Sequence, residues 1–184
     1  MEPAAGRLLV AAASLTDPNF ARVLVLLLNC DDEGCLGVVV NRATTTAVEA
    51  VLPLWAPKVC PPEVLYAGGP VETDSALGVA TLSGRGPEPI GWRPLFESTG
   101  LVDLDTPTEV IEQADAQLRI YVGYAGWGAG QLEGEIARGD WHVVPAEPED
   151  LYASDPDHLW GTVLRRQGGD LAWLATMPVD AQLN

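Results

Sequence analysis

The stretch 123–135 holds the residues whose types and spacing are most suggestive of chemistry, with the sequence GYAGWGAGQLEGE. It predicts a strand, then a glycine-rich loop, then the start of a helix, an order that can expose backbone N–H groups to an anion. However, Glu133 and Glu135 fall in the first turn of that helix, where their carboxylates would repel phosphate. The spacing also matches neither the dinucleotide-binding fingerprint nor the P-loop. We therefore favour a structural role for these glycines, which allow a tight turn.

A ligand pocket is the alternative interpretation of the same stretch. Tyr124, Trp127 and Gln131 can line a pocket for a neutral or cationic ligand. Asn41 and Arg42 follow an expected strand, and an Arg can offer a forked pair of donors to a carboxylate. A turn-forming Asn beside a surface Arg is the simpler account of that pair.

The cysteines and histidines do not have the spacing of a metal site. Cys30 and Cys35 flank an expected hairpin loop, so their thiols can approach each other, which leaves a redox-labile pair open. With Cys60 the count is odd and no export signal is seen, which favours reduced, inert thiols. His142 and His158 lie in distant segments.

Nucleophilic or acid–base catalysis has no recognisable constellation in this chain. A Gly-x-Ser-x-Gly elbow is absent from the sequence. The acidic residues are numerous, and without geometry no two of them can be nominated as a catalytic pair. We predict no catalytic residues, no metal and no cofactor, and lean against an enzyme.

Short strands and scattered helices must position these residues. Apolar runs predict strands at 8–12, 23–28, 36–40, 64–67, 76–82, 119–123 and 141–144. The second and third of these runs lack polar alternation, so they predict a central hairpin covered on both faces. Capping boxes at 46–49 and 106–109 predict short helices, and two more are expected at 130–138 and after Asp155, ending at 168–169. This order does not alternate as βαβ, so we predict an α+β fold.

Length and charge limit the domain count and the partners. The chain has 184 residues and a net charge of -16, with ten basic residues against 26 acidic ones. Residues 1–184 are expected to form a single domain, because the linker-like segment 83–94 would leave two parts too small and poor in helical core. Direct nucleic-acid or membrane binding is not expected, since no basic patch offsets the acidity. The apolar run near the N-terminus is short and no stretch could span a bilayer, so we predict a cytoplasmic protein.

Five motifs occur in the order found in the YqgE/AlgH family, which the chain resembles over essentially its whole length. They lie at 6–11, 17–20, 37–42, 68–71 and 123–133. The resemblance implies coiled, branching, mostly antiparallel β-sheets flanked by several short helices. The AlgH name comes from a proposed role in regulating transcription of alginate genes, while no reaction or ligand is established for the family as a whole.

Departures from the family pattern weigh against a shared catalytic mechanism. Members typically carry a His where this chain has Cys30, an Arg near Ser75 and a His near Ala80. The matched surface that remains supplies the candidate ligand-binding residues: Asn41, Arg42, Gly68, Gly69, Tyr124, Trp127, Gln131 and Glu133.

Together, the residues and the resemblance predict a regulatory binding module that acts through a protein or small-molecule partner. Its acidity predicts that any effect on transcription is indirect. The alternative is an enzyme on a small polar substrate, which requires the 41–42 and 123–133 segments to converge on one pocket.

Overall fold

The structure, a computed structural model, describes residues 1–84, 88–112 and 114–177, without the side chain of Val110. Residues 85–87 of the linker-like segment 83–94 therefore lie outside the description. The strands are β1 (Arg7–Ala11), β2 (Leu24–Asp31), β3 (Gly34–Val39), β4 (Ala43–Ala47), β5 (Val64–Ala67), β6 (Val71–Leu82), β7 (Trp92–Phe96), β8 (Thr99–Val102), β9 (Ala116–Gly128) and β10 (Trp141–Pro145). The helices are α1 (Val48–Val51), α2 (Glu109–Glu112), α3 (Gln131–Arg138), α4 (Pro156–Gln167) and α5 (Gly169–Leu174), with 3-10 turns η1 (Ala56–Lys58) and η2 (Pro148–Leu151).

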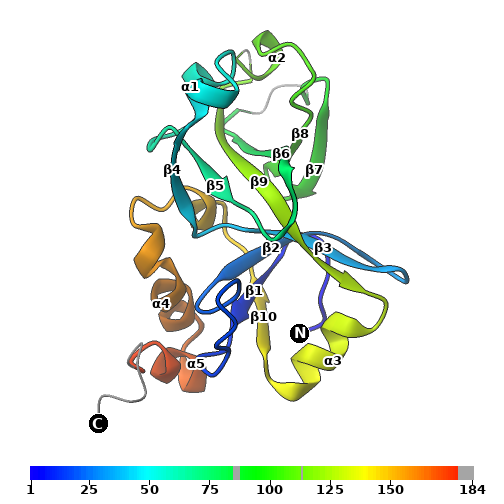
Figure 1. Cartoon of the computed structure of the whole chain (residues 1–184), viewed down its shortest axis with the longest axis vertical. Helices are drawn as coiled ribbons and strands as arrows, with labels where there is room; N and C mark the ends of the chain where they lie inside the picture. The colour runs from blue at the N-terminus through cyan, green and yellow to red at the C-terminus, as the bar shows by residue number, and fades with distance from the viewer. Residues whose placement is uncertain (85–87, 113, 178–184) are drawn as a thin grey trace.

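The strands form a branched, mostly antiparallel sheet in the order β10-β1-β2-β3-β9-β6-β8-β7, with β4 and β5 on a side branch. Strand β9 belongs to both halves of the molecule (Figure 1). Its first part pairs with β6 over Ala116–Val122, and its last part pairs with β3 over Ala125–Gly128. The predicted α+β class of coiled, branching sheets with short helices is confirmed.

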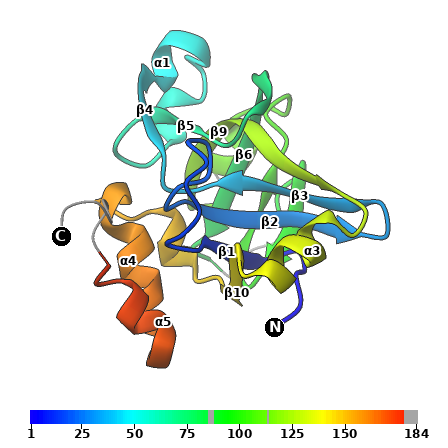
Figure 2. The same cartoon turned by 60° about the horizontal axis from the view of Figure 1, so that its bottom comes forward.

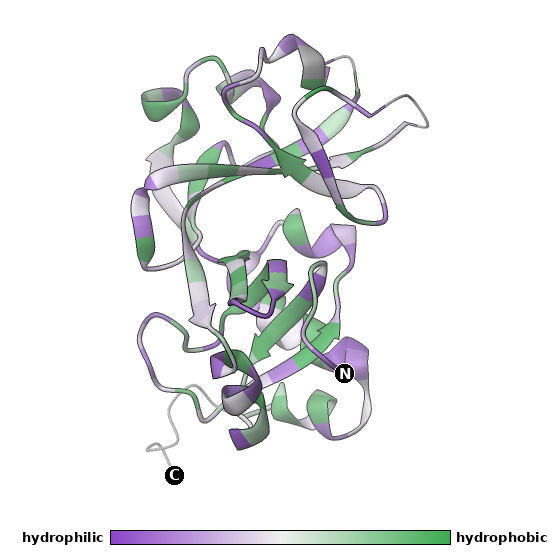
Figure 3. Ribbon diagram, turned by 90° about the vertical axis from the view of Figure 1, so that its right-hand side faces the viewer, coloured by the Kyte–Doolittle hydropathy of each residue, from purple (hydrophilic) through white to green (hydrophobic). Residues whose placement is uncertain are grey.

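The central hairpin β2–β3 has apolar side chains on both faces, as its lack of polar alternation predicts. Leu24 and Leu26 face a core that includes helix α4, whereas Val25 and Leu27 face a second core beside α3. Figure 2 shows α4 and α3 on different sides of β1 and β2, and Figure 3 shows hydrophobic colour along strands in the interior of the molecule. Full burial of each such side chain contributes roughly 1.5–3 kcal/mol, so both faces anchor the hairpin.

The sheet branches at Gly68 and Gly69, where the end of β5 enters between β3 and β9. The carbonyl of Gly68 accepts from Val39 N at 2.8 Å, and Gly68 N donates to Val122 O at 2.7 Å. A Cβ at Gly69 would overlap the carbonyl group of Tyr124. The opposing Gly123 has a φ of +69°, a left-handed conformation that glycine adopts freely. The branch therefore depends on backbones that approach too closely for side chains.

Two capping predictions are wrong. Thr46 lies in β4, and α1 starts after Ala47 without a side-chain cap, because the Thr-rich segment pairs with β5 instead. Helix α2 starts at Glu109, and the Thr106 hydroxyl donates backwards to Asp103 O at 2.6 Å. By contrast, the cap at Asp155 is confirmed, since its carboxylate accepts from His158 N.

The prediction of a glycine-rich loop after residue 123 is also wrong. Strand β9 continues through Gly128, because Gly126 and Gly128 pair with Leu36 and Gly34 of β3. The turn into α3 is therefore short and is centred on Gly130, whose φ is +71°.

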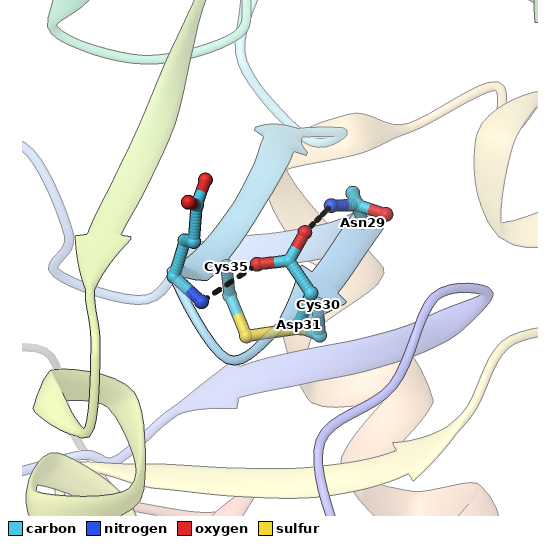
Figure 4. The surroundings of a disulfide bond; sticks show 5 residues. Asn29, Cys30, Asp31 and Cys35 are labelled. Atoms are coloured by element: carbon cyan, nitrogen blue, oxygen red, sulfur yellow. Dashed lines mark hydrogen bonds between the residues drawn. A yellow bond between two sulfur atoms is a disulfide. The ribbon is translucent and has the colours of Figure 1, made fainter.

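The expectation of reduced, inert thiols at Cys30 and Cys35 is wrong as well, because these residues form a disulfide (Figure 4). They lie directly opposite each other in the β2–β3 register, with Cα atoms 4.2 Å apart. At the same hairpin tip Asp31 accepts from Asn29 Nδ2 at 2.8 Å and from Glu33 N at 2.9 Å. Cys60 is a free thiol.

Candidate functional site

A pocket of about 270 Å³ opens between the end of β9, helix α3 and the loop that follows β1. Three aromatic residues lie along it: Phe20 is partly exposed, whereas Trp127 and Trp141 belong to the core behind the pocket, with only 6% and 2% of each residue exposed. The Trp127 and Trp141 rings meet edge to face with centroids 5.8 Å apart, and Phe20 meets Trp141 in the same manner at 5.7 Å. The other lining residues are Leu15, Asp17, Gly126, Gln131, Glu135, Arg138 and Asp140.

Glu135 holds the polar side of this pocket together. Its Oε2 accepts from Trp127 Nε1 at 2.8 Å and from Trp141 Nε1 at 2.9 Å, while Oε1 accepts from Gln131 Nε2 at 3.0 Å. Gln131 in turn accepts from the backbone N–H of Gly128 at 3.1 Å, which joins the start of α3 to the end of β9. Burial alone would raise the pKa of Glu135, but these side-chain hydrogen bonds, together with the nearby charge of Arg138, outweigh it and lower the pKa below its ordinary value. The carboxylate is therefore ionised at neutral pH.

The charged residues of the lining give the pocket a net negative charge. Asp17, Glu135 and Asp140 bring three carboxylates, and Arg138 brings one guanidinium. That guanidinium is already engaged, since its Nη2 lies 2.9 Å from Asp140 Oδ2. The geometry suits a group with positive charge and an apolar body, which can meet both carboxylates and aromatic surface.

Two of the sequence-predicted ligand residues, Trp127 and Gln131, line this pocket. Glu133, on the same helix, is exposed and is not part of the lining. Tyr124 is half-buried and packs against the core beside α4 rather than the core beside α3. Because successive residues of a strand point to opposite faces, Tyr124 and Trp127 lie on different sides of β9.

Asn41 acts inside the fold. Its side chain is buried, accepts from Leu24 N at 2.9 Å and donates to Arg22 O at 3.0 Å. The amide thus ties the end of β3 to the start of β2, and its hydrogen-bonding atoms are turned toward the backbone.

Arg42 reaches the rim of the pocket indirectly. Its Nη2 donates to Pro18 O at 2.8 Å, one residue from the pocket-lining Asp17. Burial lowers the pKa of Arg42, and the charge of Asp17 opposes that effect. The structure therefore does not gather Asn41, Arg42, Tyr124, Trp127 and Gln131 around one cavity, the arrangement that the enzyme alternative requires.

Gly68 and Gly69 lie at the branch of the sheet, where their backbone groups and lack of side chains are used structurally. Sequence reasoning missed Asp17, Phe20 and Trp141 as partners of Trp127. The motif from Asp17 to Phe20 is recognisable in the sequence, but it lies more than 100 residues from Trp127, so the contact between them cannot be predicted from local patterns.

Within the described ranges, no group of three or more His, Cys, Asp or Glu residues is placed to hold a metal ion. The helices described there include none long and apolar enough to cross a membrane.

Comparison with known proteins identifies similar chains of nearly equal length. A family model described as AlgH-like matches residues 8–172. UPF0301 protein SCO2948 of Streptomyces coelicolor is 52% identical over 182 residues, covering 97% of this chain and 94% of its own. A UPF0301 protein of Mycobacterium tuberculosis is 46% identical over 182 residues, covering 98% and 90% respectively.

Two solved structures resemble the fold along its whole length. The crystal structure of DIP2367 from Corynebacterium diphtheriae superposes with a TM-score of 0.91 at 35% identity, covering 96% of this chain and 94% of the other. The solution structure of the AlgH protein from Pseudomonas aeruginosa has a TM-score of 0.68 at 28% identity, covering 98% of both chains.

Proposed function

Since the chain belongs to the AlgH-like family, we propose that it is a cytoplasmic regulatory binding module whose contact site is the Trp127–Glu135 pocket. The group that it receives is cationic: an ammonium or guanidinium carried by a small molecule or by a partner protein. Any influence on transcription is then exerted through that contact and not by binding DNA.

The observation that carries this proposal is the ionised Glu135 at the edge of an aromatic wall. Its carboxylate is held by three neutral donors and by no cation within hydrogen-bond distance among the described residues. The carboxylate therefore stays ionised, Arg138 acts on it only through its nearby charge, and an incoming cation can interact with it directly. Asp17 at the rim adds to the attraction, and the net charge of -16 steers cations toward the molecule while repelling phosphate backbones.

The chemistry of the pocket predicts which ligands bind there, and this preference differs from the nonspecific attraction of any cation to an acidic protein. A guanidinium or ammonium on a short alkyl chain places its charge near Glu135 and its carbons against Leu15 and Phe20, the partly exposed apolar lining in front of the two Trp residues. An uncharged isostere would lose the carboxylate interaction, and an anion would be repelled.

The test is an NMR titration of the full chain with agmatine, with an arginine-containing peptide, and with the neutral analogue in which citrulline replaces arginine. Binding of a cationic probe should shift the indole N–H signals of Trp127 and Trp141, with affinity that falls as salt rises. Glu135→Gln should weaken binding about tenfold or more, the effect of losing one charge-assisted contact. Glu133→Gln, the same change on the exposed side of α3, should bind as the parent does.

The two cationic probes distinguish a free amine from a protein side chain as the source of the charge. Equal binding of the citrulline peptide, or equal weakening by both Glu substitutions, would contradict the proposal. Circular dichroism of each variant shows whether the overall secondary structure is retained.

A further inference from the structure

Among the residues that the structure describes, every buried side-chain polar atom without a hydrogen-bond partner belongs to one cluster. These atoms are the hydroxyls of Tyr66 and Tyr121 and the Nε and Nη1 of Arg119. Buried polar groups are almost always paired, so four unpaired atoms gathered in one place call for an explanation. The cluster shares no residue with the Trp127–Glu135 pocket.

The strand register explains why these side chains meet. Arg119 and Tyr121 are two residues apart in β9 and therefore point to the same face of the sheet. Tyr66 of β5 is the direct register partner of Tyr121, and their rings meet edge to face with centroids 5.8 Å apart. The guanidinium lies over the Tyr66 ring, with its carbon 4.3 Å from the centroid.

The guanidinium of Arg119 is buried, with 2% of the residue exposed. Its Nη2 donates to Pro61 O at 3.2 Å, and no carboxylate of the described residues lies within ion-pairing distance. A buried charge costs several kcal/mol unless an opposite charge compensates it. A cation–π contact and one carbonyl offset only part of that cost.

The neighbouring groups are neutral at physiological pH and leave the cluster with one positive charge. Burial raises the pKa of Tyr66 and Tyr121, and the charge of Arg119 opposes this effect. For Tyr66 a contact of its hydroxyl with the Arg119 guanidinium, which lacks good hydrogen-bond geometry, acts in the same direction as that charge. Both hydroxyls stay protonated and can donate. Burial likewise raises the pKa of the nearby Cys60 thiol. Tyr152, whose ring centroid is 5.9 Å from the guanidinium, already donates its hydroxyl hydrogen bond to Gln117 O at 2.7 Å.

We propose that Arg119, Tyr66 and Tyr121 form a binding site for one small monoanion, of the class of formate, nitrate or chloride. Water can satisfy hydroxyls, but it does not neutralise a buried guanidinium. A monoanion does both, because it accepts from the guanidinium and the hydroxyls and cancels the charge. A dianion such as sulfate would leave an excess negative charge in the interior and is excluded on the same grounds. Pro61, whose carbonyl accepts a hydrogen bond from the guanidinium, is itself exposed, so the cluster lies beneath a surface residue.

The experiment is thermal unfolding of the full chain at constant ionic strength, with gluconate replaced stepwise by formate, nitrate, chloride or sulfate. A ligand that binds the folded state raises the unfolding midpoint along a saturating curve. We expect saturation with at least one small monoanion and none with sulfate. This order differs from general salt effects, in which sulfate stabilises most.

Two variants test the site itself. Arg119→Met should abolish the saturating response, and Tyr121→Phe should weaken the affinity about tenfold, since it removes one donor to an anion and leaves the packing intact. Arg165→Met, which removes an exposed arginine from α4, should respond as the parent does. If Arg119→Met does not fold, the anion-dependent rise of the unfolding midpoint is compared between Tyr121→Phe and the parent, and that comparison tests the proposal. A response that follows the general salt order, or that is the same in Tyr121→Phe as in the parent, overturns the proposal.

Discussion

Asp150 and Arg119 are both charged and both buried, with 3% and 2% of each residue exposed, yet they are held in opposite ways. The Asp150 carboxylate accepts hydrogen bonds from both terminal nitrogens of the Arg166 guanidinium, at 2.7 and 2.9 Å, and from the backbone N–H of Glu147 at 2.9 Å. The Arg119 guanidinium donates one hydrogen bond and has an aromatic ring in place of a carboxylate.

This difference in pairing identifies Asp150 as a structural charge and Arg119 as a candidate for binding a ligand. Asp150 joins η2 to α4 and is fully compensated within the chain, so nothing further is required to explain it. Arg119 is compensated only in part, and its unpaired atoms face neighbours that are unpaired too. In the Trp127–Glu135 pocket, Glu135 is an intermediate case. Neutral donors satisfy the hydrogen-bonding needs of its carboxylate, but no ion pair among the described residues neutralises its charge.

The largest effect is expected from Arg166→Met. This change leaves the Asp150 carboxylate buried without its cation and should lower the free energy of unfolding by about 3–5 kcal/mol. Urea denaturation provides the measurement. Arg165→Met on the same helix is the control, since it removes an exposed charge and should change stability by about 0.5 kcal/mol or less. Equal losses in the two variants would show that the pair does not stabilise the fold.

A smaller effect is expected from Arg119→Met, measured by the same denaturation in gluconate buffer. The substitution removes one hydrogen bond and a cation–π contact but also relieves a buried charge, so the loss should be about 1–2 kcal/mol. A loss as large as that of Arg166→Met would mean that Arg119 is fully compensated in the free protein, and the contrast between the two buried charges would then disappear.

The smallest effect concerns Glu135 and appears only in acid. Because its pKa in the folded state lies below the ordinary value of 4.5, Glu135 contributes stability above that pH and loses it as the pH falls through the lowered value. The parent should therefore lose stability more steeply below about pH 4.5 than Glu135→Gln does. The contribution is small because the side chain is partly exposed and screened by solvent. Identical acid profiles for parent and variant would contradict the hydrogen-bonding role assigned to Glu135.

Local sequence patterns predicted the parts of the fold whose partners lie close in the chain. The apolar runs of β1, β2, β3 and β5 and the Asp155 cap of α4 were all visible, because burial on both faces and capping leave signatures within a few residues. The sequence does not predict β4 and β7, which are largely exposed and lack a strong apolar pattern, or β8, which is mostly buried but has only four residues, including a Thr and a Gly.

The candidate sites were less predictable. The sequence by itself determined that the chain is acidic and rich in apolar strands, and it picked out Trp127 and Gln131 as possible ligand contacts. The alternation of Gln117, Arg119 and Tyr121 with apolar residues also hinted at a polar face on β9, a signal that only burial makes meaningful.

Tertiary structure decided the rest. It turned the glycine-rich stretch into a strand by pairing it with β3, and it brought Phe20 to Trp127 and Tyr66 to Arg119 across more than 50 residues. The physical reason is that a residue's type fixes what it can bind, whereas burial and long-range pairing fix whether its partners are already present. The sequence therefore supplied the charges of this protein, and only the fold determined which of them are compensated within the chain.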